Sequence, residues 1–259
     1  MKFDAHILEY LKGKKFSNGL HIKYEYFEPI PNRVKLLSDL VRGKRVLHLG
    51  CLDHLPLIDV KIANHEWLHQ ELTSTASICL GIDIEREVIS YVKEKHGFTN
   101  IIEGNILDAI IPEVQKGTWD FAVLGELLEH IDNPVHFLSE IRQKYDNSIS
   151  KMIITVPNVL MQKNVRAMRK SSEVINSDHR YWFTPYTLAK VILQAGLELD
   201  EILFANRVPL TAPELIRKKI ITLAGGQARY PFTYASSIVA IASLRNPNGL
   251  KFQSEDNTK

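Results

Sequence analysis

The sequence has little of several features that mark special classes of protein. It contains only two cysteines, Cys51 and Cys79, in 259 residues, and both lie in apolar runs typical of buried strands. A disulfide framework is therefore not expected, and a reducing compartment, the cytoplasm, is the natural location. No continuous apolar run reaches the ~18 residues needed to span a bilayer, and the N-terminal segment lacks the apolar core of a signal peptide. We therefore expect a soluble chain that is not exported.

The sequence also lacks an excess of charge of one sign. Its 32 Lys and Arg residues and 30 Asp and Glu residues leave a formal net charge of +2 at pH 7. This balance argues against a protein that binds polyanions with its whole surface, although it permits a local basic patch. With 45% hydrophobic residues, the chain has enough apolar side chains for one large globular domain.

Between Lys44 and Pro157, short apolar runs alternate with patterns typical of helices. The predicted strands are 45–49, 78–84, 100–103, 119–124 and 151–156, and two more follow near 197–205 and 232–244. The first five runs are continuously apolar, which is typical of parallel strands buried on both faces. Helices are predicted over 85–95 and 134–145, and a third begins at Pro185 and ends at Gly196. We therefore predict an α/β, Rossmann-like fold with a seven-stranded, mostly parallel sheet and helices on both faces.

Three segments lie outside this alternation. Residues 1–43 are predicted to form a helical N-terminal cap. Residues 158–181 and 206–230 are basic, partly helical insertions that follow strands at the expected active edge, where we expect them to act as lids. The main domain would thus span residues 44–245, and the polar tail over residues 246–259 is predicted to be flexible.

Glycines and polar residues follow the first three predicted strands, at the edge where parallel sheets bind ligands. Gly50 allows a tight turn after the first strand and the close approach of a ligand to the backbone. Asp83 ends the second strand, where its carboxylate can accept hydrogen bonds from both hydroxyls of a ribose. Asn105 follows the third strand, and its amide can donate to and accept from an adenine edge. Together these residues predict a nucleoside-binding site.

Motifs that follow one another in the family's order make the chain resemble the class I S-adenosylmethionine-dependent methyltransferases. The segments VLHLGCLD and GIDI are similar to the glycine-rich and acidic motifs of that family. WDFAVLGELLEHIDNPVHFL is similar to its fourth strand and following helix, and IITVPN to its fifth strand. The resemblance covers about residues 44–205 and implies an enzyme that binds S-adenosylmethionine (SAM). The cofactor-binding residues that it implies are Gly50, Cys51, Asp53, Asp83, Ile84, Asn105 and Ile106.

The glycine-rich loop departs from the family pattern. Leu52 and Asp53 follow Cys51, so that only Gly50 remains of the usual glycines. Two outcomes stay open. Either the bulkier loop still holds the amino-acid end of the cofactor, or the chain has lost cofactor binding and is a binding protein on a methyltransferase fold.

Glu126, Glu129 and His130 follow the fourth predicted strand, where a methyl acceptor should meet the sulfonium group. In a helix, Glu126 would lie on the same face as Glu129 and His130, which are three and four residues further along. Two carboxylates and an imidazole suit a divalent cation such as Mg²⁺, and the histidine is also a candidate general base for a hydroxyl.

The ExxEH pattern at this position resembles two branches of the family, the ubiquinone-biosynthesis O-methyltransferases and the small-RNA 2′-O-methyltransferases. The second branch has a further histidine downstream, and His179 stands in a similar context. The resemblance implies a metal site formed by Glu126, Glu129, His130 and His179, with His130, His179 and Glu126 as catalytic residues. In metal-free relatives, by contrast, the equivalent histidine only forms a hydrogen bond, and this alternative stays open.

The sequence therefore favours a SAM-dependent methyltransferase that methylates a hydroxyl of a small molecule or a glycan, with or without a divalent cation. The alternatives are an RNA 2′-O-methyltransferase and a non-catalytic binding protein with the same fold. The nearly balanced charge makes a nucleic-acid partner less favoured, although the two basic insertions keep it open.

Overall fold

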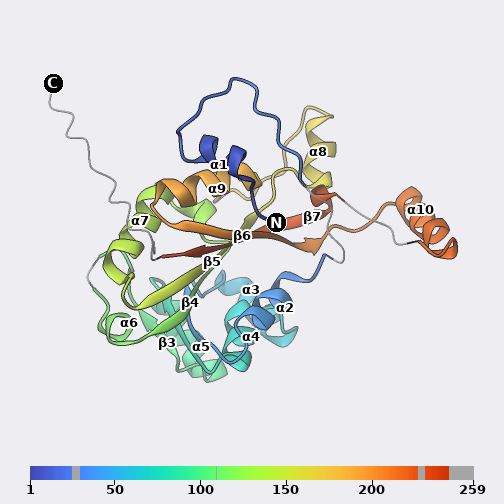
Figure 1. Cartoon of the computed structure of the whole chain (residues 1–259). Coiled ribbons are helices and arrows are strands. Elements are labelled where there is room, and N and C mark those ends of the chain that lie inside the picture. The colour runs from blue at the N-terminus through green and yellow to red at the C-terminus, as the bar shows by residue number, and fades with distance from the viewer. Residues whose placement is uncertain (25–29, 109, 227–230, 245–259) are drawn as a thin grey trace.

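The structure, a computed structural model, describes residues 1–24, 30–108, 110–226 and 231–244. In this part of the chain, seven strands form one sheet in the order β3-β2-β1-β4-β5-β7-β6 (Figure 1). The strands are β1 (Arg45–Leu49), β2 (Ile78–Asp83), β3 (Ile101–Glu103), β4 (Trp119–Gly125), β5 (Ile149–Pro157), β6 (Glu198–Arg207) and β7 (Ala235–Ser243). β1 to β5 pair in parallel, whereas β7 is antiparallel to both of its neighbours. The predicted seven-stranded, mostly parallel sheet is thus confirmed.

The cysteines and the last strand differ slightly from expectation. Cys79 lies in β2, but Cys51 lies in the loop after β1 and not in a strand; both thiols are buried and free. Residues Phe232–Tyr234, predicted as the start of the last strand, form a 3₁₀ turn, η2, before β7 begins.

Helices cover both faces of the sheet, as predicted. On one face lie α1 (Ala5–Leu11), α6 (Pro112–Lys116), α7 (Pro134–Tyr145) and α9 (Pro185–Gln194), and on the other α2 (Arg33–Leu40), α3 (Leu55–Ala63), α4 (Leu68–Thr75) and α5 (Arg86–His96) (Figure 1). Local signals explain two of the boundaries. The Asn133 side chain accepts a hydrogen bond from the His136 amide at the start of α7, and Thr184 forms a capping box at the start of α9.

The N-terminal segment is helical as predicted, and its two helices lie on opposite faces of the sheet. α1 packs against α9 on one face of the sheet, whereas α2 packs against α4 on the other. Leu11 of α1 and Leu37 of α2 are fully buried in two different parts of the core. The segment therefore extends both helical layers, because each of its helices has its own apolar side to bury.

Both insertions leave the sheet at the same edge. α8 (Gln162–Met168) follows β5, and α10 (Ala212–Leu223) lies between β6 and β7. Since β7 runs antiparallel, the pairs Pro157↔Ser237 and Arg207↔Ala235 both lie at the carboxyl ends of the parallel strands. α10 extends away from the body of the protein (Figure 1). Of the described helices, none is long and apolar enough to cross a membrane, and the predicted flexible tail lies outside the described residues.

Candidate active site

A cavity of about 1040 Å³ lies where the strand order reverses, between β1 and β4. Its walls come from the loops after β1, β2, β3 and β4, which is where open parallel sheets bind ligands. All seven residues predicted to bind the cofactor line it: Gly50, Cys51, Asp53, Asp83, Ile84, Asn105 and Ile106. The insertion over residues 158–181 contributes Asn176 and His179, but no described residue of the second insertion, 206–226, lines the cavity. The role of this second insertion as a lid over the site stays a prediction.

The altered glycine-rich loop forms a tight turn that is tied to β2. Gly50 has φ +63°, and a Cβ atom there would lie 2.8 Å from a methyl group of Leu127, so both the backbone and the available space require glycine. The Cys51 carbonyl accepts a hydrogen bond from the Trp67 indole at 2.9 Å. The Leu52 amide donates to Oδ2 of Asp83 at 2.9 Å. The loop thus keeps a defined shape without the remaining glycines.

Asp83 is buried and accepts hydrogen bonds from the backbone on both of its carboxylate oxygens. Oδ1 accepts from the amides of Ile84 at 2.8 Å and Glu85 at 3.2 Å, whereas among the described residues Oδ2 accepts only from Leu52. A carboxylate has about four acceptor positions, so Oδ2 can accept one more hydrogen bond, from a ligand hydroxyl. Ile84 is 65% exposed beside it on the cavity wall and offers an apolar surface to a flat ring.

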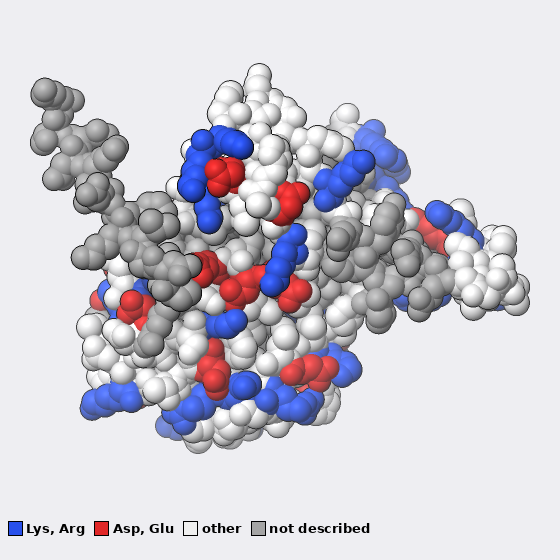
Figure 2. Space-filling model, viewed as in Figure 1, with Lys and Arg blue, Asp and Glu red and all other residues white. Residues whose placement is uncertain are grey.

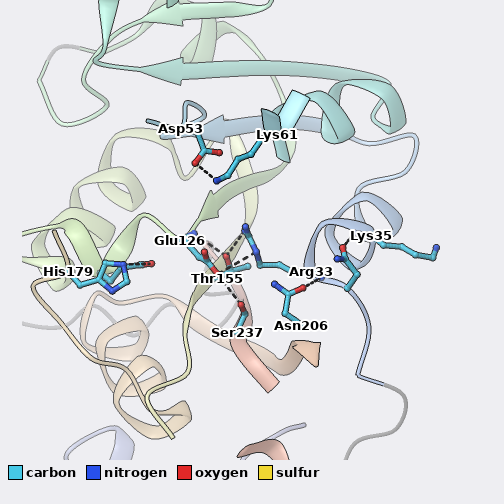
Figure 3. Close-up of polar contacts among 11 residues, drawn as sticks. Arg33, Lys35, Asp53, Lys61, Glu126, Thr155, His179, Asn206 and Ser237 are labelled. Atoms are coloured by element: carbon cyan, nitrogen blue, oxygen red, sulfur yellow. Dashed lines mark hydrogen bonds and ion pairs between the residues drawn. The ribbon is translucent and has the colours of Figure 1, made fainter. Parts of the chain in front are cut away.

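The other predicted cofactor residues have partners within the chain. Asp53 pairs with Lys61 of α3 (Figure 3). Asn105 uses its side chain to close its own turn, since Oδ1 accepts from the Leu107 amide at 3.0 Å and Nδ2 donates to Asp108 at 3.2 Å. Its predicted contact with an adenine edge would compete with these bonds.

Glu126 does not lie in a helix, so the prediction that it shares a face with Glu129 and His130 is wrong. It has φ +59°, its amide donates to the Thr155 carbonyl at 3.0 Å, and only residues Leu128–His130 form a short 3₁₀ helix, η1. Its carboxylate lies 3.5 Å from Nε of Arg33 and accepts a hydrogen bond from Ser237 at 3.0 Å (Figure 3). The pairing of β4 with β5 ends at Gly125, directly before Glu126, and the Glu126 carboxylate is not part of the cluster formed by the other three predicted ligands.

The other three predicted metal ligands do come together. One ligand atom from each of Glu129, His130 and His179 lies within 4.8 Å of the others. The rings of His130 and His179 meet edge to face, and Oε1 of Glu129 lies 4.0 Å from Nε2 of His179. The Arg180 amide donates to the Glu129 carbonyl at 2.8 Å, which fastens the first insertion to η1 and places His179 in the cluster.

This cluster contains buried polar atoms that lack partners. Glu129 is fully buried, and neither of its carboxylate oxygens has a hydrogen-bond partner among the described residues. Burial, reinforced by the charge of Glu126, raises the pKa of Glu129 to about 8. Burial and then His130 lower the pKa of His179, whose Nδ1 is also without a partner in the described chain. Such atoms are costly unless something binds them, and this set of oxygen and nitrogen donors fits a divalent cation.

Sequence reasoning missed three residues that fix Glu126. Arg33 comes from α2, Thr155 from β5 and Ser237 from β7. Arg33 and Ser237 belong to none of the motifs found in the sequence, and Thr155 lies in IITVPN without being a site residue by type. The three residues meet because α2 and β7 pack beside the ends of β4 and β5. No signal in the sequence alone would have identified them.

Comparisons with known proteins agree with this architecture. A family model described as a methyltransferase domain matches residues 21–202. A SAM-dependent methyltransferase from Archaeoglobus fulgidus has a similar structure, with a TM-score of 0.50 and 16% identity over 82% of this chain and 91% of that one. A possible histamine N-methyltransferase from Thermotoga maritima also has a similar structure, with a TM-score of 0.51 and 14% identity over 82% of this chain and 87% of that one.

A small RNA methyltransferase also shares the fold, with a TM-score of 0.51 and 15% identity over 88% of this chain but only 27% of its own length. No curated protein sequence matches the chain significantly. The family match covers more than half of the chain, and the sheet and cavity agree with it. The chain therefore belongs to the methyltransferase domain family and, by family and fold, is a SAM-dependent methyltransferase.

Proposed function

We propose that this enzyme transfers the methyl group of SAM to a hydroxyl oxygen of a small molecule or a glycan, and that a divalent cation assists the transfer. The observation that carries the proposal is the cluster of buried Glu129 with half-buried His130 and His179 on the wall of the cofactor cavity. Its unpaired oxygen and nitrogen atoms need a ligand, and an O-methyl acceptor needs a group that takes up its proton.

The cavity residues fit SAM in two respects. The free acceptor position of Asp83 suits a ribose hydroxyl, and the exposed side chain of Ile84 suits the face of an adenine ring. Gly50 lets the turn after β1 approach the ligand closely. When bound, SAM supplies an electrophilic methyl group on a sulfonium.

The chain's own residues would hold the acceptor and its proton. The acceptor oxygen loses a proton as it forms the bond to the methyl carbon. His179 is the group proposed to accept this proton when no cation is bound, because an imidazole that binds a cation has no lone pair left for a proton. Glu129, His130 and His179 would hold a divalent cation, which lowers the pKa of a bound hydroxyl and orients it. Glu126, fixed by Arg33 and Ser237, is proposed to orient the acceptor at the same wall.

Calorimetric titration with S-adenosylhomocysteine tests the cofactor site without knowledge of the acceptor. Asp83→Asn should weaken binding about tenfold or more, because a hydrogen bond to a charged group contributes about 1.5–3 kcal/mol. Asp39→Ala, which removes an exposed carboxylate from α2, is the matched control and should bind like the wild type. Absence of binding by the wild-type protein would refute the proposal and favour the non-catalytic binding protein.

Turnover with a panel of hydroxyl acceptors, measured as release of S-adenosylhomocysteine, tests the cation. Activity should fall in EDTA, return with Mg²⁺ or Mn²⁺, and be lost in Glu129→Gln and His130→Ala. His6→Ala, on the exposed side of α1, is the control and should stay active. Full activity of His130→Ala would contradict its proposed role in holding the cation.

RNA 2′-O-methylation is the second candidate, favoured by basic residues in the first insertion. Lys163, Arg169 and Lys170 lie in the same insertion as His179. Methylation of a short RNA in the same assay, with binding that weakens steeply as salt is added, would favour it over a small acceptor.

A further inference from the structure

Helix α10 carries apolar side chains that no described part of the chain covers. Leu215, Ile216, Ile220 and Leu223 are 52%, 61%, 61% and 85% exposed, and the helix has no buried residue. Ile216, Ile220 and Leu223 follow one another at spacings of four and three residues, so they lie on one face of the helix. A contiguous apolar face exposed to water marks an interaction surface.

The position of α10 is fixed by polar contacts at its first turn. The Glu214 side chain accepts a hydrogen bond from the Thr211 amide at 2.7 Å and another from the Tyr234 hydroxyl. It also pairs with Arg166 of α8 at 3.0 Å. The helix is therefore held from its polar side, and its later turns project from the body of the protein (Figure 1).

The net charge of α10 is positive. Arg217, Lys218 and Lys219 follow one another in the middle of the helix, and Glu214, its only acidic residue, is already paired with Arg166. Figure 2 shows Lys and Arg side chains beside the uncharged surface at the projecting end. The partner must therefore offer both an apolar phase and negative charge.

These requirements distinguish among the partners that the helix could have. A second copy of the chain would bring two clusters of like charge together, which is unfavourable. A nucleic acid would neutralise the basic side chains but leave the apolar face in water. The surface of an anionic bilayer satisfies both, because apolar side chains enter the boundary of the acyl region while Lys and Arg reach the phosphates.

We propose that α10 is an amphipathic helix that docks on membranes containing anionic lipids. α10 lies between β6 and β7 in the chain, and it leaves the sheet at the edge where the cofactor cavity lies. Docking through α10 would therefore hold this edge toward the bilayer. The inference goes beyond the proposed function and does not depend on methyl transfer.

Co-sedimentation with vesicles tests the proposal. The wild-type protein should bind vesicles that contain phosphatidylglycerol and phosphatidylcholine, and it should bind pure phosphatidylcholine much more weakly. The double variant Ile216→Ser with Ile220→Ser should bind the mixed vesicles about tenfold more weakly or worse, since it loses apolar area. Lys218→Gln with Lys219→Gln should show a loss of similar size and a weaker response to salt.

Val60→Ser is the matched control, because Val60 is an apolar residue on α3 that is 59% exposed and does not line the cavity. It should bind vesicles like the wild type. Calorimetric binding of S-adenosylhomocysteine should be unchanged in all of these variants, which shows that they are folded. It also separates failure of docking from failure of the proposed function.

Three outcomes would overturn the proposal. The first is failure of the wild-type protein to bind the mixed vesicles, or binding that neither double variant weakens. The second is a dimer in analytical ultracentrifugation that only the isoleucine variant loses, which would assign the face to a second copy. The third is binding of a short RNA that only the lysine variant loses, without any binding of vesicles.

Discussion

Replacing Glu129 with glutamine should change how the stability of the protein depends on pH. Burial and the charge of Glu126 raise the pKa of this carboxyl group from 4.5 to about 8 in the folded protein. Between these values the folded protein keeps a proton that the unfolded chain releases. The stability contribution of this group is therefore fully present below about pH 4.5 and is lost as pH rises through about 8.

The size of the effect follows from the width of this interval. Each pH unit within it changes the free energy of unfolding by about 1.4 kcal/mol, and the side chain is fully buried, so solvent screening does not reduce the value. Glutamine has a similar shape and carries no titratable proton. From about pH 5.5 to about pH 7.5, the wild-type protein should therefore lose about 2–3 kcal/mol of stability relative to Glu129→Gln.

Urea denaturation followed by circular dichroism, in EDTA at three pH values across this range, measures the difference. Glu113→Gln, an exposed carboxylate on α6, is the control and should follow the wild type at every pH. Adding Mn²⁺ at the highest pH should stabilise the wild type but not Glu129→Gln, because the cation replaces the proton of Glu129. A difference between the two proteins that is the same at all three pH values would refute the reasoning.

Three further substitutions test other parts of the structure. Gly50→Ala should destabilise the protein by about 1–2 kcal/mol, because φ is +63° at this position; an unchanged urea midpoint would contradict this account. Thr184→Ala should lower the free energy of unfolding by about 1 kcal/mol, because α9 loses its N-terminal cap. Calorimetry should show a lower Tm, and an unchanged Tm would mean that the cap does not stabilise the protein. Arg33→Met should raise the pKa of Glu129 further, because the Arg33 guanidinium lowers it. In the urea denaturation experiment, the pH range over which stability falls should extend to higher pH. If the upper end of that range does not move, Arg33 does not affect the pKa of Glu129.

Much of the fold followed from local signals in the sequence. The run over 45–49 is β1 as predicted, since a strand buried on both faces favours apolar side chains such as Val46, Leu47 and Leu49. Pro134 begins α7 because the preceding Asn133 caps it, and Pro185 begins α9 after Thr184 in the same way. These features depend on neighbouring residues, so the sequence contains them directly.

The candidate site was predicted only in part. The seven proposed cofactor residues line one cavity because the carboxyl ends of parallel strands meet at one edge of a sheet. Glu129, His130 and His179 also come together, although His179 belongs to a distant segment. Glu126 does not join them, because helical spacing was assumed at a residue that lies between the end of β4 and the short helix η1, with φ +59°.

The sequence by itself determined the order of strands and helices, the edge that binds ligands and the residue types gathered there, because these depend on periodicity and on local capping. Only the tertiary structure decided that Arg33 and Ser237 hold Glu126, since contacts between distant segments depend on how the layers pack. It also decided that α10 stays uncovered. An amphipathic pattern predicts that a helix has an apolar face, but only the packing of the whole chain determines whether that face is buried.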